Sequence, residues 1–245
     1  MNKEQKSRLF TSLFFPILFV AIIWLVKVAE IVFETNFAHY GIFPRKTEGL
    51  IGILFYPLIH SGFNHLINNT TSLLILGIGI FHFYRPVAYN IYFLTYIMSG
   101  IWIWVSARES YHIGASGLIY GFASFIFLSG IIRRNTKLLA LSLLVTFLYG
   151  GMVWGIFPIR AGMSWEGHLW GSVAGVILAF YYRNIGPVRK KYSWELEEES
   201  NANIPMDTSD TNEEMEEKKE KEEKNKDHGI AFRYIYKPKN REGNN

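Results

Sequence analysis

The sequence predicts an all-α polytopic membrane protein, and two observations lead to this fold class. First, apolar residues dominate residues 9–182, whereas the segment after residue 195 is rich in lysine and glutamate, so the hydrophobic content of 49% averages two different compositions. Second, the apolar part divides into six runs of 15 to 25 residues, close to the roughly 20 that an α-helix needs to cross a hydrocarbon core. Because only helices and closed barrels satisfy their backbone inside a bilayer, runs of this length indicate helices.

We therefore expect a short N-terminus (1–8), a membrane domain of six helices (9–186) and a charged tail (187–245). The tail carries mixed glutamate and lysine runs with few aromatic residues, which cannot bury a core, so it is expected to be cytoplasmic and disordered, the alternative being a solvated helix. The six predicted spans are Leu9–Phe33, His65–Tyr84, Asn90–Ser106, Ser116–Ile132, Leu138–Gly155 and His168–Tyr182.

The first run, Leu9–Val26, could be mistaken for a signal sequence, but no small-residue cleavage site follows it, so we interpret it as a retained span. A loop of about thirty residues, Glu34–Asn64, follows, and its second half is apolar but too short to span a bilayer. Such a segment is typical of an interfacial or re-entrant element that lies partly in the membrane and is sheltered by protein.

Basic residues at the ends of the runs predict the orientation, because cytoplasmic flanks carry an excess of lysine and arginine. The ends on the side of the two termini carry eleven such residues and the opposite ends carry four. The larger set is Lys3, Lys6, Arg8, Arg85, Arg133, Arg134, Lys137, Arg183, Arg189, Lys190 and Lys191, and the smaller is Arg45, Lys46, Arg108 and Arg160. Both termini are therefore predicted to be cytoplasmic, which puts the starts of spans two, four and six together on the outer side.

Composition also excludes several functions. The chain has no cysteine, so disulfides, thiolate metal sites and a cysteine nucleophile are excluded. The pI of about 9.1 does not indicate nucleic acid as a partner, because the basic residues flank apolar spans, where they set orientation. The expected partner is the lipid bilayer, and neither a metal nor another cofactor is expected.

A hydroxyl between small residues heads the fourth run, in Gly114-Ala115-Ser116-Gly117. Small neighbours let another helix or a substrate backbone approach the Ser116 oxygen, as in the Gly-x-Ser-x-Gly turns of many hydrolases. No strand precedes this one, and small residues around a serine are also typical of close helix packing in membranes. Alone, the motif leaves a nucleophile and a packing residue as alternatives.

His168 opens the sixth run and shares a helical face with Gly171 and Gly175, at i+3 and i+7. A Gly-x-x-x-Gly pair lets a neighbouring helix pack closely, and the span that begins at Ser116-Gly117 is the natural partner. Packing through these glycines would bring Ser116 and His168 together as a pair for nucleophilic catalysis. The alternative is a histidine at the membrane interface that is satisfied by water.

The second run adds His65 and Asn69, which lie one turn apart on one helical face. An imidazole N–H, an amide NH₂ and the backbone N–H of Ser116 could bind the negative charge that develops on a carbonyl oxygen during acyl transfer. The alternative is a polar face that lines a water cavity. Other polar side chains expected to wet this cavity are His60, Asn64, Asn68, Thr70, Thr71 and Ser72.

Together these motifs resemble those of the rhomboid intramembrane serine proteases of the bacterial six-span type. They are Gly-Ala-Ser-Gly with a tyrosine four residues after the serine, His-x-x-x-Asn upstream, and His-x-x-Gly-x-x-x-Gly in the last span. The resemblance covers Leu9 to Tyr182, with the motifs in the right order and in the right spans. It implies a six-transmembrane-helix bundle with a half-submerged first loop, located in the bacterial inner membrane, that hydrolyses peptide bonds in or near transmembrane segments of other proteins.

The resemblance implies a role for each matching residue. Ser116 would be the nucleophile and His168 its general base and later acid, while His65, Asn69 and the Ser116 amide would form the oxyanion hole. Tyr120, one turn past Ser116, would stack on His168 and orient it. The remaining assignments are helix packing for Gly117, Gly171 and Gly175, a structural role for His60, and anchoring of the first loop by Pro44-Arg45, where the usual Trp-Arg pair of the family is missing.

Substrates should contain helix-weakening residues near the outer face, since a helical backbone offers no accessible carbonyl. As in the family, they would reach the serine between spans two and five, where Gly150-Gly151 and Gly155 make span five a loosely packed helix.

Three other functions compete with this hypothesis. A rhomboid-like protein that binds transmembrane helices without cutting them would have lost the serine, the histidine or the oxyanion donors, which this chain keeps. A metal-dependent protease or transporter could use His60, His65, His112 and His168, but the sequence has no His-Glu-x-x-His. An unrelated six-span protein would need all three motifs to coincide by accident.

Overall fold

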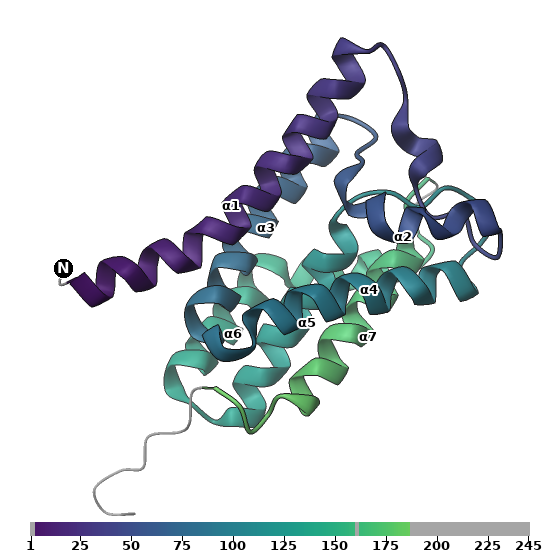
Figure 1. The fold of residues 1–245 in the computed structure, drawn as a ribbon. Coiled ribbons are helices and arrows are strands. Elements are labelled where there is room, and N and C mark those ends of the chain that lie inside the picture. Colours follow the sequence, from purple (N-terminus) through teal and green to yellow (C-terminus); the bar gives the residue numbers. More distant parts are fainter. Residues whose placement is uncertain (1–2, 160–161, 187–245) are drawn as a thin grey trace, which may run out of the picture. The chain divides into compact units, whose positions relative to one another are not determined.

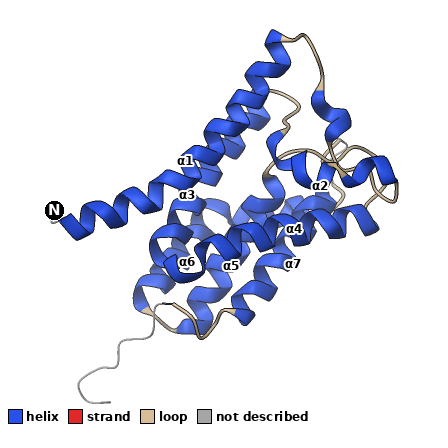
Figure 2. Ribbon diagram, viewed as in Figure 1, coloured by secondary structure: helices blue, strands red, loops and turns tan. Residues whose placement is uncertain are grey.

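The computed structural model describes residues 3–159 and 162–186, and throughout these residues the regular elements are helices joined by loops (Figure 2). The six predicted spans are all helical, which confirms the all-α class; the predicted tail, 187–245, lies outside the described residues. The long helices are α1 (Lys3–Val32), α3 (Phe63–Phe83), α4 (Ala88–Ser106), α5 (Ser116–Arg133), α6 (Thr136–Tyr149) and α7 (Trp165–Tyr181). The short ones are η1 (Phe37–Tyr40), η2 (Thr47–Leu50), α2 (Gly52–Phe55), η3 (Tyr56–Leu58), η4 (Arg85–Val87) and η5 (Gly150–Ile156).

The helix ends differ from the predicted ends by up to six residues. α1 begins at Lys3 instead of Leu9, and α7 begins at Trp165 instead of His168. Helical hydrogen bonding continues into the polar residues that flank each span, whereas a hydropathy window detects only the apolar residues that would lie in the hydrocarbon core. Span five is divided, since its α-helix ends at Tyr149 and its last residues form the 3₁₀ segment η5.

Four stretches of the described residues are long and apolar enough to cross a membrane by length and composition: Gln5–Val32, Phe63–Phe83, Ser116–Arg133 and Thr136–Ile156. Helices α4 and α7 fall outside this group, and α7 has only 17 residues. Both pack against α5, so protein neighbours supply part of their surroundings. Several apolar helices in one bundle are what a polytopic membrane protein requires.

Helix α5 forms the centre of the bundle and contacts α3, α4, α6 and α7 (Figure 1). In its apolar window 61% of the residues are buried, compared with 11% in the corresponding window of the stretch that comprises α6 and η5. Large side chains around α5 build the core, among them Phe122 and Phe125, which are fully buried. The helix that begins with Ser116 is thus held on several sides, whereas α6 is exposed over most of its surface.

Helices α5 and α7 pack through glycine. A Cβ atom at Gly171 would lie 2.8 Å from the carbonyl carbon of Gly117, and one at Gly175 would lie 2.9 Å from that of Gly121. At Gly117 itself, a Cβ would lie 3.2 Å from the carbonyl oxygen of Gly167. The backbones therefore approach more closely than any residue with a side chain would allow. This contact sets the distance between the starts of the two helices.

The first loop is folded into short helices, of which α2 packs against α4 and η3 packs against α1 and α5. The Arg45 guanidinium donates a hydrogen bond of 2.7 Å to the carbonyl of Ala107 and lies 3.4 Å from the Glu109 carboxylate. Trp104 on α4 donates through Nε1 to the Lys46 carbonyl at 2.9 Å. Arg45 thus anchors the loop without the tryptophan that usually precedes it, and a tryptophan from another element binds the same segment.

Candidate active site

The starts of α3, α5 and α7 bring the predicted site residues to one end of the bundle. Ser116 is the first residue of α5, while His168 and His65 lie in the first turns of α7 and α3. The Ser116 Oγ atom lies 2.9 Å from Nε2 of His168, within hydrogen-bonding distance. The two residues are 52 positions apart in the chain, and the glycine contact between α5 and α7 brings them together.

Tyr120 lies one turn beyond Ser116 and stacks on the His168 ring. The ring centroids are 4.1 Å apart and the planes differ by 6°. His168 is 7% exposed, so its imidazole is nearly enclosed. The stack restricts the plane in which the imidazole can lie, as the resemblance implied for this tyrosine.

His65, Asn69 and the Ser116 amide surround the same space. The first N–H groups of a helix have no acceptor within the helix, which leaves the Ser116 amide available to a ligand. Gly114, two residues earlier, has φ = 105°, and a Cβ there would lie 2.6 Å from Cε1 of His65 and 3.6 Å from Nδ2 of Asn69. Only glycine combines this backbone conformation with so close an approach to both side chains.

His60 lies behind the predicted oxyanion donors and is 2% exposed. Its Nε2 accepts a hydrogen bond of 2.9 Å from the Asn69 amide, and Lys27 donates to its backbone carbonyl at 3.0 Å. Burial, followed by the nearby His65, lowers the pKa of His60 to about 4. The ring is therefore neutral near pH 7, which lets Nε2 accept and hold the Asn69 side chain in place.

A cavity of about 810 Å³ opens beside these residues. It is lined by Ser61, His65, Asn68, Asn69, Ser72, Arg108, Ser110, Tyr111, Ile113, Ser116, Ile119, Tyr120, Met152, Gly162, Met163, Ser164 and His168.

Of the other polar side chains expected to wet this cavity, only Asn68 and Ser72 line it. Thr70 instead accepts a hydrogen bond from Trp24, and Thr71 donates to its own helix. The prediction was therefore wrong for His60, Asn64, Thr70 and Thr71. Within α3, helix rotation turns successive residues to different neighbours.

Sequence reasoning missed an ion pair that lies next to the cavity. Nε of Arg108 lies 3.4 Å from a carboxylate oxygen of Glu166, and the Glu166 side chain is 5% exposed. Arg108 also donates to the Met163 carbonyl, which joins the α4–α5 connection to the segment before α7. A carboxylate two residues before His168 in an apolar run was the available signal, since charges there are costly unless paired.

His112, which the metal hypothesis included, has a different setting from the other histidines. Its Nδ1 lies 2.6 Å from the Ser164 hydroxyl and its Nε2 lies 3.0 Å from the Arg108 carbonyl. Burial lowers the pKa of His112, so the ring is neutral near pH 7. Among the described residues, no three His, Asp or Glu side chains gather in a metal-binding arrangement.

Residues 47–185 match the Rhomboid domain family, so the chain belongs to the rhomboid family and is an integral membrane protein. An uncharacterized protein of Mycobacterium tuberculosis is 36% identical over 176 residues, which cover 66% of this chain and 71% of the relative. An uncharacterized protein of Mycobacterium bovis matches with the same values. One of Mycobacterium leprae is 33% identical over 177 residues, 66% of this chain and 68% of the relative.

Proposed function

We propose that this rhomboid is an intramembrane serine endopeptidase that uses a Ser116–His168 dyad. The observation that carries the proposal is the 2.9 Å approach of Ser116 Oγ to His168 Nε2 beside a cavity lined by polar side chains. A nucleophile within hydrogen-bond reach of a base, with the base itself oriented by a third group, is the arrangement of covalent hydrolases. Here Tyr120 supplies the orienting contact.

In the first half of the reaction, Ser116 Oγ attacks the carbonyl carbon of the substrate while Nε2 of His168 takes the hydroxyl proton. Negative charge then develops on the carbonyl oxygen, within reach of the Ser116 amide and the Asn69 side chain. Asn69 uses one amide hydrogen to bind His60 and keeps the other for the oxyanion. The Ser61 hydroxyl lies 3.2 Å from Nδ1 of His65, and in the tautomer that the mechanism requires it donates to Nδ1, so that the His65 ring carries its proton on Nε2 and adds a further donor.

In the second half, the imidazolium of His168 gives its proton to the leaving amine, and the C–N bond breaks to leave an acyl ester on Ser116. Water from the cavity then attacks the ester, His168 takes a proton from that water, and the ester bond breaks to release the carboxylate product. His168 finally returns the proton to Ser116 Oγ. Each step uses side chains already within reach of one another, so no cofactor is needed.

The substrates we propose are transmembrane segments of other proteins in a bacterial cell membrane. Both termini of this chain would lie in the cytoplasm, and the division into 1–8, 9–186 and 187–245 would separate the protease from its flanks. The site residues lie at the starts of α3, α5 and α7, which we place near one membrane surface. There a substrate helix must unwind to expose a carbonyl. Substrates with glycine or proline close to that surface should therefore be cleaved fastest.

We further propose that substrates reach Ser116 between α3 and α6. Support comes from the packing of α6, which lies on α5, carries η5 onto α7 and makes little contact with α3. Disulfide cross-linking of engineered cysteine pairs across these two helices should slow the cleavage of a transmembrane substrate and leave a small water-soluble substrate unaffected. Unchanged cleavage of the transmembrane substrate would contradict this route.

The test of the function is cleavage of a fluorescent transmembrane substrate by purified protein in liposomes, beside Ser116→Ala and His168→Ala. Activity that survives chelators and disappears in both variants is the expected result. Activity that persists in Ser116→Ala would refute the dyad. Absence of cleavage by folded wild-type protein across several substrates would favour a rhomboid-like protein that binds transmembrane helices without cutting them.

A further inference from the structure

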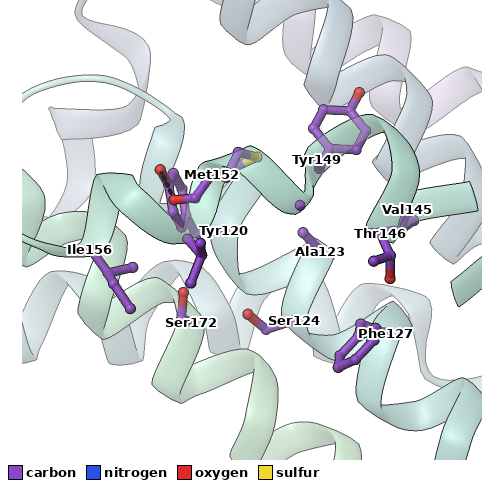
Figure 3. A pocket seen from close by; sticks show the side chains of 12 residues that line it. Tyr120, Ala123, Ser124, Phe127, Val145, Thr146, Tyr149, Met152, Ile156 and Ser172 are labelled. Atoms are coloured by element: carbon purple, nitrogen blue, oxygen red, sulfur yellow. Dashed lines mark hydrogen bonds between the residues drawn. The ribbon is translucent and has the colours of Figure 1, made fainter. Parts of the chain in front are cut away.

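Two backbone carbonyls of η5 contact the His168–Tyr120 pair. Nδ1 of His168 lies 2.9 Å from the carbonyl oxygen of Gly155, and the Tyr120 hydroxyl donates to the carbonyl of Met152 at 2.8 Å. Figure 3 shows Tyr120 beside Met152, in a second cavity of about 360 Å³ that α5, α6, η5 and α7 line. Both partners of the stack are therefore held by one short segment that belongs to neither α5 nor α7.

The contact with Gly155 determines where the proton of His168 is. A carbonyl oxygen only accepts hydrogen bonds, so Nδ1 must carry the hydrogen. In the neutral ring, Nε2 then has its lone pair free, and this lone pair faces Ser116 Oγ at 2.9 Å. In Ser-His-Asp enzymes a carboxylate performs this task by accepting from Nδ1. Here a neutral carbonyl occupies the corresponding place.

We propose that the Gly155 carbonyl is the third member of the catalytic arrangement, a positioning group that fixes the tautomer and direction of His168. The Met152 carbonyl completes the arrangement by holding the Tyr120 ring against the imidazole. This inference rests on the proposed protease function. It assigns to η5 a role that the sequence alone did not indicate, because a backbone acceptor has no side-chain signature.

The residue at position 155 must be glycine for this geometry. A Cβ there would overlap the Tyr120 hydroxyl and would lie 3.0 Å from its Cζ atom and 3.2 Å from Nδ1 of His168. A side chain would therefore push η5 away from both rings. Gly151, four residues earlier in the same segment, has open space where its Cβ would be, so it offers a matched control.

The reactivity of the dyad therefore depends on the position of η5. Helix α5 holds Ser116 and Tyr120, and α7 holds His168, but the acceptors belong to the stretch from α6 to η5, whose most apolar window is only 11% buried. If η5 moves away, Nδ1 loses its acceptor and the imidazole can rotate or change tautomer. The reactivity of Ser116 should therefore report the position of η5.

The test compares Gly155→Ala with Gly151→Ala in the full-length protein in detergent micelles. A fluorophosphonate probe measures the reactivity of Ser116, and a transmembrane substrate gives kcat and KM. We expect Gly155→Ala to lower the labelling rate constant and kcat at least about tenfold with little change in KM, because only the orientation of the base is affected. Gly151→Ala should label within about twofold of wild type, since its Cβ meets no atom.

A second-site variant separates orientation from general damage. Tyr120→Phe removes the hydroxyl that a Cβ at position 155 would overlap. The loss of labelling rate and kcat caused by Gly155→Ala should therefore be severalfold smaller in the Tyr120→Phe background than in wild type. Equal losses in the two backgrounds, or a Gly155→Ala protein as reactive as Gly151→Ala, would overturn the proposal.

A readout independent of activity allows the role of the Gly155 carbonyl and the protease function to be tested separately. In protein labelled with ¹⁵N-histidine, the Nδ1–H of His168 should give a hydrogen-bonded, exchange-protected proton signal, assigned by its loss in His168→Gln. Gly155→Ala should abolish this signal, and Gly151→Ala should keep it. A wild-type protein that lacks the signal, or a Gly155→Ala variant that retains it, would refute the role of Gly155. A wild-type protein that has the signal but neither labels nor cleaves would refute the protease function alone.

Discussion

Replacing Gly171 by alanine should show how strongly the dyad depends on the α5–α7 contact. The added Cβ would lie 2.8 Å from the carbonyl carbon of Gly117 and 3.0 Å from its Cα. Ordinary contact between carbon atoms needs about 3.5–4.0 Å, so the helices must separate or slide by about 1 Å. Because both atoms belong to backbone, no side chain can rotate to relieve the contact.

A displacement of about 1 Å in a catalytic arrangement can cost about 10²-fold in rate, and forced overpacking typically costs about 1–3 kcal/mol of stability. We expect Gly171→Ala to lower kcat by about that factor and to lower the thermal unfolding midpoint. The assays are initial-rate cleavage of a transmembrane substrate and thermal unfolding in detergent.

Gly79→Ala on α3 is the matched control, since its Cβ would lie 3.7 Å from Ile126 Cδ1, which is ordinary contact. It should be neutral or more stable by up to about 1 kcal/mol, because alanine favours a helix more than glycine does. A Gly171→Ala protein with wild-type kcat and unfolding midpoint would show that the glycine contact does not set the geometry of the site.

Three further predictions concern the oxyanion donors and the buried polar groups. Asn69→Ala should lower kcat by about 10²–10³ with a small change in KM, measured by initial rates, because a donor to the transition state is lost. Lowering the pH from 6.5 towards 4 should reduce the free energy of unfolding, since the unfolded chain protonates His60 near 6.5 and the folded one only near 4; the whole interval is worth on the order of 3 kcal/mol, measured by denaturant titration. Thr95→Val should be neutral or stabilising by about 1 kcal/mol in the same assay, whereas Ser99→Ala should cost about 1 kcal/mol.

Thr95→Val and Ser99→Ala should have different effects because the two hydroxyls differ in hydrogen bonding. Within the described residues the Thr95 hydroxyl is buried without a partner, while Ser99 Oγ lies 2.8 Å from the Tyr56 hydroxyl. Equal effects of the two substitutions would contradict that reasoning.

For the pH series, His60→Gln keeps an acceptor for Asn69 and does not titrate, so the stability of this variant should fall less steeply between pH 6.5 and 4. A slope identical to that of wild type would show that other groups cause the loss.

Sequence alone determined the fold class of the protein and named most residues of the candidate site. Six apolar runs predicted six helices, because the length of an apolar run and the hydrogen bonding it requires are local properties. Ser116, His168, His65 and Asn69 could be named because reactive side chains are uncommon in such runs and their spacing places them on helix faces. What the spacing could not provide was the distance between the helices.

Tertiary structure alone decided which groups complete the site. The Gly155 carbonyl could not be predicted, since every residue carries a backbone carbonyl oxygen and only packing selects which carbonyl reaches His168. The pairing of Arg108 with Glu166 joins residues 58 positions apart, and the anchoring of Arg45 on Ala107 joins residues 62 apart. Such contacts depend on how the loops pack against α4 and α7. The physical reason is that periodicity records which face of a helix is apolar, whereas the identity of a polar partner depends on three-dimensional proximity.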